Sequence, residues 1–572
     1  MNVWASSLLL ASALALTACK PTIASAPRAP VADASPGRTS NKTAANADWS
    51  EPWPVLSTAF ADLVPADAFI VMVNEGPLPP AAVEALEPLT RAALDAIDDG
   101  LRTRDTDGAR RAIDFIGPSL DADDLRRLGL DPNPRVLLYS YGLATALRVS
   151  LADAGKIEAL FRENPSPNVT LRNHHGQAFW DFPPGPVEEG EPPLQVVVAI
   201  SGDDLLLGGF PPGFEDELLP LLFGQRLPEK RLWNTDFVGH AQREHGLMPH
   251  YLVRLNLQRL FALGTNTADG PDQAIANAMG LGSVAEECPD EFTRIFESTP
   301  VIYGGFRSFT KDSVESALVL EVAPALATAL RVLASPIPGL EASPEPNESL
   351  ALGVGFDFAG VEAIVSLWGR AVQERPFTCS EYVNFNELAN GDELLSGVPT
   401  VLRHLKGAAV AVHSLGETER GAARVHAVIG FDDPLQALSG PFAAAFDIDP
   451  RKIPLRRVAR VAEIAPFSAL ETDAPGTKIT RTDAAVSIGT GTTPNATLRT
   501  AARVQRPNDG TLLLLRWNLV RWMDSPDRDF LSDDVPPSVN ALVTAIFSYL
   551  QHGSMAVRAR TSAVSLDVTL KR

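Results

Sequence analysis

Two long segments decide the fold: "GGFRSFTKDSVESALVLEV" (304–322) and "GSMAVRARTSAVSLDVTLKR" (553–572). In each, two runs that mix apolar and polar residues flank a short polar turn, which is the pattern of a β-hairpin with one face toward a core. Their later strands align, because "DSVESALV" (312–319) resembles "TSAVSLDV" (561–568). We therefore predict that the chain carries the same long hairpin twice.

Two further blocks recur in the same order. "YLVRLNLQRL" (251–260) resembles "LLLLRWNLVRW" (512–522), and earlier "SGDDLLLGG" (201–209) resembles "RTDAAVSIG" (481–489). Blocks that repeat in one order along a chain indicate an internal duplication. The alternative is two unrelated α+β domains, since strand and helix patterns also look alike by chance.

The remaining patterns indicate an α+β fold. Short β-rich runs such as "AFIVMV" (68–73) and "RVLLYSYG" (135–142) alternate with helical patterns at 80–102 and 152–162. Tight joins between strands, as at 202–204, favour antiparallel pairing over a doubly wound parallel sheet. We predict antiparallel sheets with packed helices, arranged in two duplicated halves.

Composition sets the expected boundaries of these halves. A Pro-rich linker, "SPIPGLEASPEPN" (335–347), divides the body into a first half (51–334) and a second half (348–572). Residues 19–50 are rich in Ala, Pro, Ser, Thr and Asn and show no apolar period, so we expect a disordered tether there.

The N-terminal segment indicates export. The apolar run at 8–18 is about ten residues long, too short to span a bilayer and typical of a signal peptide. It ends in "LTAC" (16–19), which resembles the lipobox of bacterial lipoproteins. The resemblance implies that residues 1–18 are removed and that Cys19 becomes a first residue carrying acyl chains such as palmitate. A soluble secreted protein that is cut elsewhere is the alternative.

The residue after the lipobox cysteine implies a destination. In lipoproteins of the Gram-negative type, a residue other than aspartate at that place usually directs the protein to the outer membrane, and here it is Lys20. The resemblance therefore implies a lipid-anchored protein of the bacterial cell envelope, whose membrane partner is reached through the N-terminal lipid.

Charge argues against one class of partner. The chain of 572 residues has 49 Lys and Arg against 70 Asp and Glu, a net charge of −21. Nucleic-acid binding draws its affinity from cations that neutralise phosphates, so we expect no nucleic acid. No segment after the signal peptide has 18 consecutive apolar residues, so lipid alone would hold the protein to the membrane.

Cysteine usage predicts one disulfide. The chain has 3 Cys, and acylation of Cys19 leaves Cys288 and Cys379. Because the envelope is an oxidising compartment, we expect these two to pair across the Pro-rich linker. Two independent buried thiols are the alternative.

The histidine-rich stretch "GHAQREHGLMPHY" (239–251) invites a zinc interpretation. Its His240 and His245 are five residues apart, about 140° around a helix, whereas a pair on one helical face is needed for the known helical zinc motifs. His240 and Glu244 would share a face, but a lone pair is more typical of a helix surface. We therefore predict no metal site here.

Other candidate motifs lack a required member. "VHSLG" (412–416) resembles the nucleophile elbow of α/β-hydrolases but has Val412 where the first glycine is needed, and a strand follows it rather than a helix. His174 and His175 would point to opposite sides of a strand. We assign no catalytic residue, no metal ligand and no cofactor.

These observations favour an outer-membrane-anchored envelope lipoprotein with a non-catalytic binding or scaffolding role. Its ligand would be a protein or a small apolar molecule of unknown identity, bound where the two halves meet. One alternative is a carrier or sensor of apolar ligands. The other is a hydrolytic enzyme whose site is assembled from distant segments, which local motifs do not exclude.

Overall fold

The structure is a computed structural model of the whole chain. It describes residues 62–74, 129–131, 135–163, 169–182, 195–210, 212–248, 251–266, 291, 294, 297–310, 313–340, 349–380, 382–396, 398, 400–414, 424–432, 461–464, 477–482, 484–489, 493–506, 508–518 and 552–571. The signal peptide at 1–18, the tether at 19–50 and the helical pattern at 80–102 lie outside these residues.

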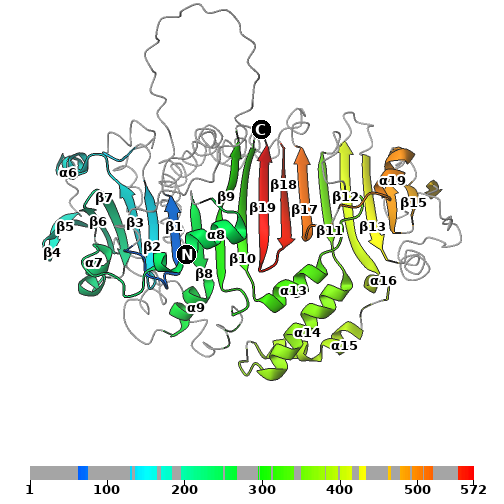
Figure 1. Cartoon of the computed structure of the whole chain (residues 1–572), viewed down its shortest axis with the longest axis horizontal. Coiled ribbons are helices and arrows are strands. Elements are labelled where there is room, and N and C mark those ends of the chain that lie inside the picture. Colours follow the sequence, from blue (N-terminus) through cyan, green and yellow to red (C-terminus); the bar gives the residue numbers. More distant parts are fainter. Residues whose placement is uncertain are drawn as a thin grey trace, which may run out of the picture.

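Within the described residues, all strands join in a single antiparallel sheet that runs the length of the molecule (Figure 1). From one edge to the other they are β4 (Thr170–His174), β5 (Gln177–Phe182), β6 (Gln195–Ser201), β7 (Asp204–Phe210), β3 (Ala144–Ser150), β2 (Val136–Tyr141), β1 (Ile70–Asn74), β8 (Leu252–Asn256), β9 (Val301–Thr310), β10 (Ser313–Glu321), β19 (Ala563–Lys571), β18 (His552–Ala559), β17 (Thr511–Asn518), β11 (Leu350–Gly355), β12 (Leu405–Ser414), β13 (Arg424–Phe431), β16 (Ala485–Gly489), β15 (Thr477–Arg481) and β14 (Val461–Ile464).

The predicted hairpins are confirmed as β9–β10 and β18–β19, and they lie side by side in the middle of the sheet. Their outer strands pair antiparallel, from Ser313 opposite Lys571 to Glu321 opposite Ala563. We call this pairing of β10 with β19 the seam. Separate sheets were expected, and the structure has one, because each hairpin covers the other's free edge.

Helices connect and flank the strands, so the predicted antiparallel sheet with packed helices is confirmed. Described helices are α6 (Ala154–Glu163), α7 (Glu215–Leu222), α8 (Phe237–His245), α9 (Leu257–Asn266), α13 (Pro324–Leu333), α14 (Phe358–Glu374), α15 (Gly391–Ser396), α16 (Thr400–Arg403) and α19 (Asn495–Ala501), with 3-10 turns η1 (Leu232–Thr235) and η2 (Val383–Asn390). The helical pattern predicted at 152–162 is α6.

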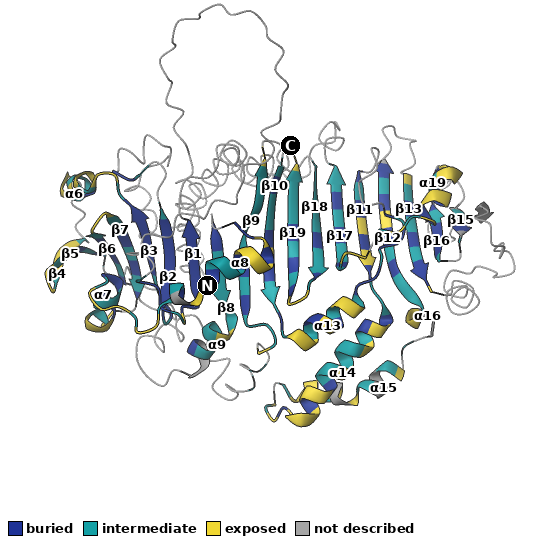
Figure 2. Ribbon diagram, in the orientation of Figure 1, coloured by how far each residue is buried: buried dark blue, intermediate teal, exposed yellow. Residues whose placement is uncertain are grey.

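The larger core lies in the first half. Strands β1 and β2 are buried along their whole length, dark blue in Figure 2, and Tyr139 of β2 is among the largest fully buried side chains. In the second half, burial alternates along β11, so one face of the sheet is covered and the other is open.

The start of the Pro-rich linker covers that second-half face. Ile337 and Leu340 are buried there with Ala351 of β11. The backbone of Ser335 lies so close to β11 that a Cβ on Gly355 would be 2.1 Å from its carbonyl oxygen. The first part of the predicted linker is therefore part of a core, and only glycine fits opposite it.

Candidate metal centre

Two imidazoles and one carboxylate converge above the end of β10. His240 Nε2 lies 2.6 Å from Glu321 Oε1, and His245 Nε2 lies 3.0 Å from the same oxygen. The potential ligand atoms of the three residues all lie within 4.8 Å of one another. No local sequence motif contains all three residues, because Glu321 is 76 residues from His245 along the chain.

The helix α8 is fixed over the sheet by its end. The last residue of α8 is His245, and Gly246 follows in the left-handed conformation with φ 65°. The helix therefore ends there, and Leu247 N donates a hydrogen bond back to Ala241 O. Met248 N then donates to Phe306 O at 2.7 Å, which ties the chain to β9. Figure 1 shows α8 lying across β8 and β9.

The five-residue spacing does not keep the two imidazoles apart, and whether they bind a metal stays untested. His240 and His245 do leave the helix in different directions, and their ring planes stand 88° apart with centroids 5.3 Å apart. Both rings nevertheless reach one oxygen, because the third group comes from another element and lies between them. Glu244 is exposed, and His250 lies outside the described residues.

Burial and charge act on this cluster in opposite directions. Burial alone would raise the pKa of Glu321, but hydrogen bonds from His245 and His240 hold that pKa below its usual range. Tyr303 of β9 packs against both rings, at centroid distances of 5.2 Å and 5.9 Å. Burial raises the pKa of Tyr303, and the charge of Glu321 adds to that rise. The cluster thus favours an ionised carboxylate next to a neutral phenol.

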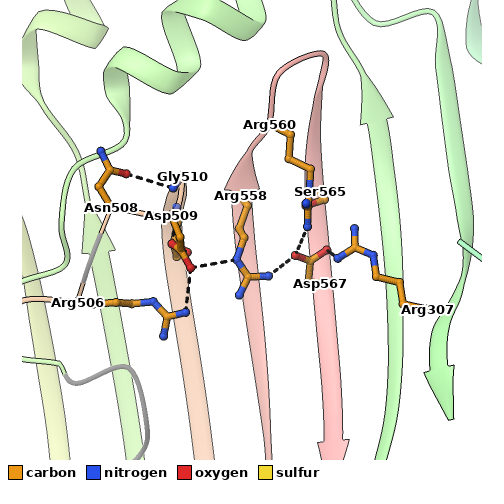
Figure 3. Close-up of polar contacts among 10 residues, drawn as sticks. Arg307, Arg506, Asn508, Asp509, Gly510, Arg558, Arg560, Ser565 and Asp567 are labelled. Carbon is orange, nitrogen blue, oxygen red and sulfur yellow. Dashed lines mark hydrogen bonds and ion pairs between the residues drawn. The ribbon is translucent and has the colours of Figure 1, made fainter. Parts of the chain in front are cut away.

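A second polar cluster lies at the seam (Figure 3). Asp567 of β19 is bound by three guanidinium groups: those of Arg307 on β9 at 2.8 Å, of Arg560 at 2.9 Å, and of Arg558 on β18. The side chain of Asp567 is only 9% exposed. Because Arg307 belongs to the first half and Asp567 to the second, this cluster joins the halves.

The seam cluster continues into the loop before β17. Asp509 lies 3.1 Å from Arg506 and 3.7 Å from Arg558, so Arg558 stands between two carboxylates. Burial lowers the pKa of Arg307, with Asp567 opposing the change and Arg560 and Arg558 adding to it. Such a closely packed set of opposite charges is suited to holding strands in register.

A cavity of about 270 Å³ lies in the second half. Pro336 and Pro338 line it together with an ion pair of Lys406 and Asp357, whose atoms are 2.6 Å apart. A carrier of apolar ligands needs a pocket of several hundred Å³ lined by aromatic and aliphatic side chains. This cavity is smaller and more polar, and it lies away from the seam.

The predicted lipid and disulfide sites fall largely outside the described residues. Cys19 and Cys288 both lie outside them. Cys379 is disulfide-bonded. Glu291 accepts hydrogen bonds from Thr378 N at 2.6 Å and from Cys379 N at 3.0 Å. Since Glu291 follows Cys288 by three positions, pairing of Cys288 with Cys379 stays our prediction.

Comparison with known proteins found no relative of this chain. No family model, no curated protein and no solved structure matches it. Among the helices that the structure describes, none is both long and apolar enough to cross a membrane.

From the sequence, His240 and His245 were considered but rejected as a ligand pair, and Glu321 was not considered. A signal for Glu321 was present, because it continues the alternation of Ala317 and Val319, which are both buried on one face of β10. Asp567 carries the same signal at an inward position of β19. A charged residue at an inward strand position calls for a partner, but the sequence does not say which one.

Proposed function

We propose that this protein is a lipoprotein of the bacterial envelope, anchored in the outer membrane by lipid on Cys19, with a non-catalytic binding role. The proposed ligand is apolar, either a small molecule or a patch of another protein. The anchor rests on the lipobox-like "LTAC" (16–19). The binding role rests on one face of the central sheet.

We also infer that the two halves are duplicates. Outward from the seam, the first half has β10, β9, β8, β1, β2, β3, β7, β6 and β5, and the second has β19, β18, β17, β11, β12, β13, β16, β15 and β14. These two orders correspond strand by strand when each half is numbered along the chain without β4, the edge strand of the first half, which has no counterpart among the described strands of the second half. The correspondence supports a duplication together with the three repeated sequence blocks.

The observation that carries the binding role is a row of apolar side chains across the seam. Each stands directly opposite the next on neighbouring strands, and so on one face: Leu318, Leu566, Val557, Leu513 and Val354. The two ends of the row are 49% and 36% exposed. None of these five side chains is buried.

A second exposed pair extends this row. Leu352 and Val410 stand opposite each other on β11 and β12 and are 45% and 42% exposed. Leu352 shares its face with Val354, since side chains two apart in a strand point the same way. Contiguous apolar surface of this kind is typical of a site that binds an apolar ligand or partner.

Titration with 1-anilinonaphthalene-8-sulfonate, a fluorescent probe of apolar sites, tests this proposal. We expect Leu318→Gln and Leu352→Gln each to weaken probe binding by roughly fivefold, the equivalent of about 1 kcal/mol of lost apolar contact. The matched control is Leu171→Gln, because Leu171 is 66% exposed on the distant edge strand β4. Equal probe binding by all three variants and the unaltered protein would refute an apolar site on this face.

A further inference from the structure

We propose that His240, His245 and Glu321 bind one divalent transition-metal ion, and we name zinc as that ion. This inference does not depend on the apolar binding face or on the lipid anchor. It rests on the convergence of three suitable donors from two elements at one point.

The donor set fits zinc. Imidazole nitrogen and carboxylate oxygen are both ordinary zinc ligands, and two His with one Glu is a known set in sites that keep a fourth position open. Hard ions such as magnesium or calcium prefer sets made of oxygen alone. Two nitrogens and one oxygen therefore favour zinc or a neighbouring transition metal.

The distances also fit, after a small rearrangement. Zinc bonds to nitrogen and oxygen of about 2.1 Å place tetrahedral ligands roughly 3.4 Å apart. The Nε2 to Oε1 distances are now 2.6 Å and 3.0 Å, as expected where a proton lies between each pair. An ion that replaces those protons needs each pair to open by less than about 1 Å.

Two of the three ligand side chains are held by packing, and the third is accessible to solvent. The side chain of His245 is 1% exposed and that of Glu321 is 22% exposed, so these two ligands are held by packing. The side chain of His240 is 41% exposed and can turn aside to admit an ion. The ring of Tyr303 lies next to both imidazoles. Three protein ligands leave a coordination position for water.

A hydrogen-bonded triad with no metal function is the competing explanation. In that case each Nε2 carries a proton and donates it to Glu321, and the triad only fastens α8 to β10. The two explanations differ in one measurable respect, because only the metal site has an affinity for zinc that depends on all three side chains.

The test is zinc titration of the full-length protein in detergent, after removal of metal with a chelator and in competition with a chromophoric zinc indicator. We expect one tightly bound zinc per chain. We expect His240→Ala and Glu321→Gln each to weaken that binding by roughly tenfold or more, as for the loss of a ligand. Glu321→Gln keeps the shape and much of the hydrogen bonding, and His240 is exposed enough to be replaced without unfolding.

The matched control is His404→Ala, since His404 pairs with Asp432 at 2.7 Å elsewhere on the surface. This control should bind zinc like the unaltered protein. Cobalt should give the same ranking and a visible absorption band of tetrahedral type that both site variants lose. If the unaltered protein binds no zinc, or if both site variants retain its affinity while staying folded by circular dichroism, the proposal is wrong.

Discussion

His413 and His426 form a buried pair in the second half. Their rings stack at a centroid distance of 4.9 Å, and His413 Nε2 lies 2.9 Å from His426 Nδ1. Burial lowers the pKa of His426 to about 4, and the neighbouring His413 adds to that effect. The folded protein therefore keeps His426 neutral at pH values where an unfolded chain would protonate it.

This lowered pKa predicts a loss of stability in mild acid. Because the unfolded state binds more protons between about pH 6.5 and pH 4, the free energy of unfolding falls as the pH falls through that window. By pH 5 we expect a loss of about 2 kcal/mol from His426. Urea unfolding at pH 7.5 and pH 5 should show this loss in the unaltered protein and not in His426→Gln.

The control for this measurement is His175→Asn, because His175 is exposed in a turn with φ 48° that asparagine also adopts. This variant should keep the full acid sensitivity. Equal pH dependence in His426→Gln and the unaltered protein would show that the buried pair does not control acid stability.

The helices α13 and α14 contact each other through their backbones. Gly360, in the first turn of α14, faces the last residue of α13, and a Cβ built on it would lie 2.1 Å from Leu333 Cα. Asp357 N donates to Leu333 O at 2.7 Å, which fixes the crossing further. The start of α14 is set by Asp357, whose side chain accepts a hydrogen bond from Ala359 N.

We predict that Gly360→Ala destabilises the protein. A methyl group has no room at a backbone contact, so the two helices must separate, at a cost of about 1–3 kcal/mol. Ser366→Ala, on the exposed side of the same helix, should be neutral or slightly stabilising. Thermal unfolding followed by circular dichroism compares the two. A Gly360→Ala protein as stable as Ser366→Ala would refute the described crossing.

Elements were predictable from the sequence where the pattern is local. The two long hairpins and α6 follow from alternation and helical period, which act within a few residues. The pairing of β10 with β19 was not predictable, because alternation shows which face of a strand is buried but not which strand lies next to it. The cluster of His240, His245 and Glu321 was missed for the same reason, since Glu321 reaches the two histidines only after the fold brings α8 onto β10.

For the whole molecule, the seam makes one body of the two halves. Backbone pairing runs along the full length of β10 and β19, and Arg307 crosses it to bind Asp567. The linker adds a second contact, because Gly339 N donates to Val504 O at 2.8 Å. A first half attached to the membrane should therefore carry the second half with it.

The most direct test of this account is to place a specific protease site within 341–347 and cut the protein in isolated membranes. Reducing agent is included so that a disulfide of Cys379 cannot hold the fragments together. We predict that the C-terminal fragment, which lacks Cys19, stays with the membranes through the seam. With Cys19→Ser, both fragments should be soluble. Release of the C-terminal fragment alone would contradict the seam, and release of both fragments with Cys19 intact would contradict the anchor.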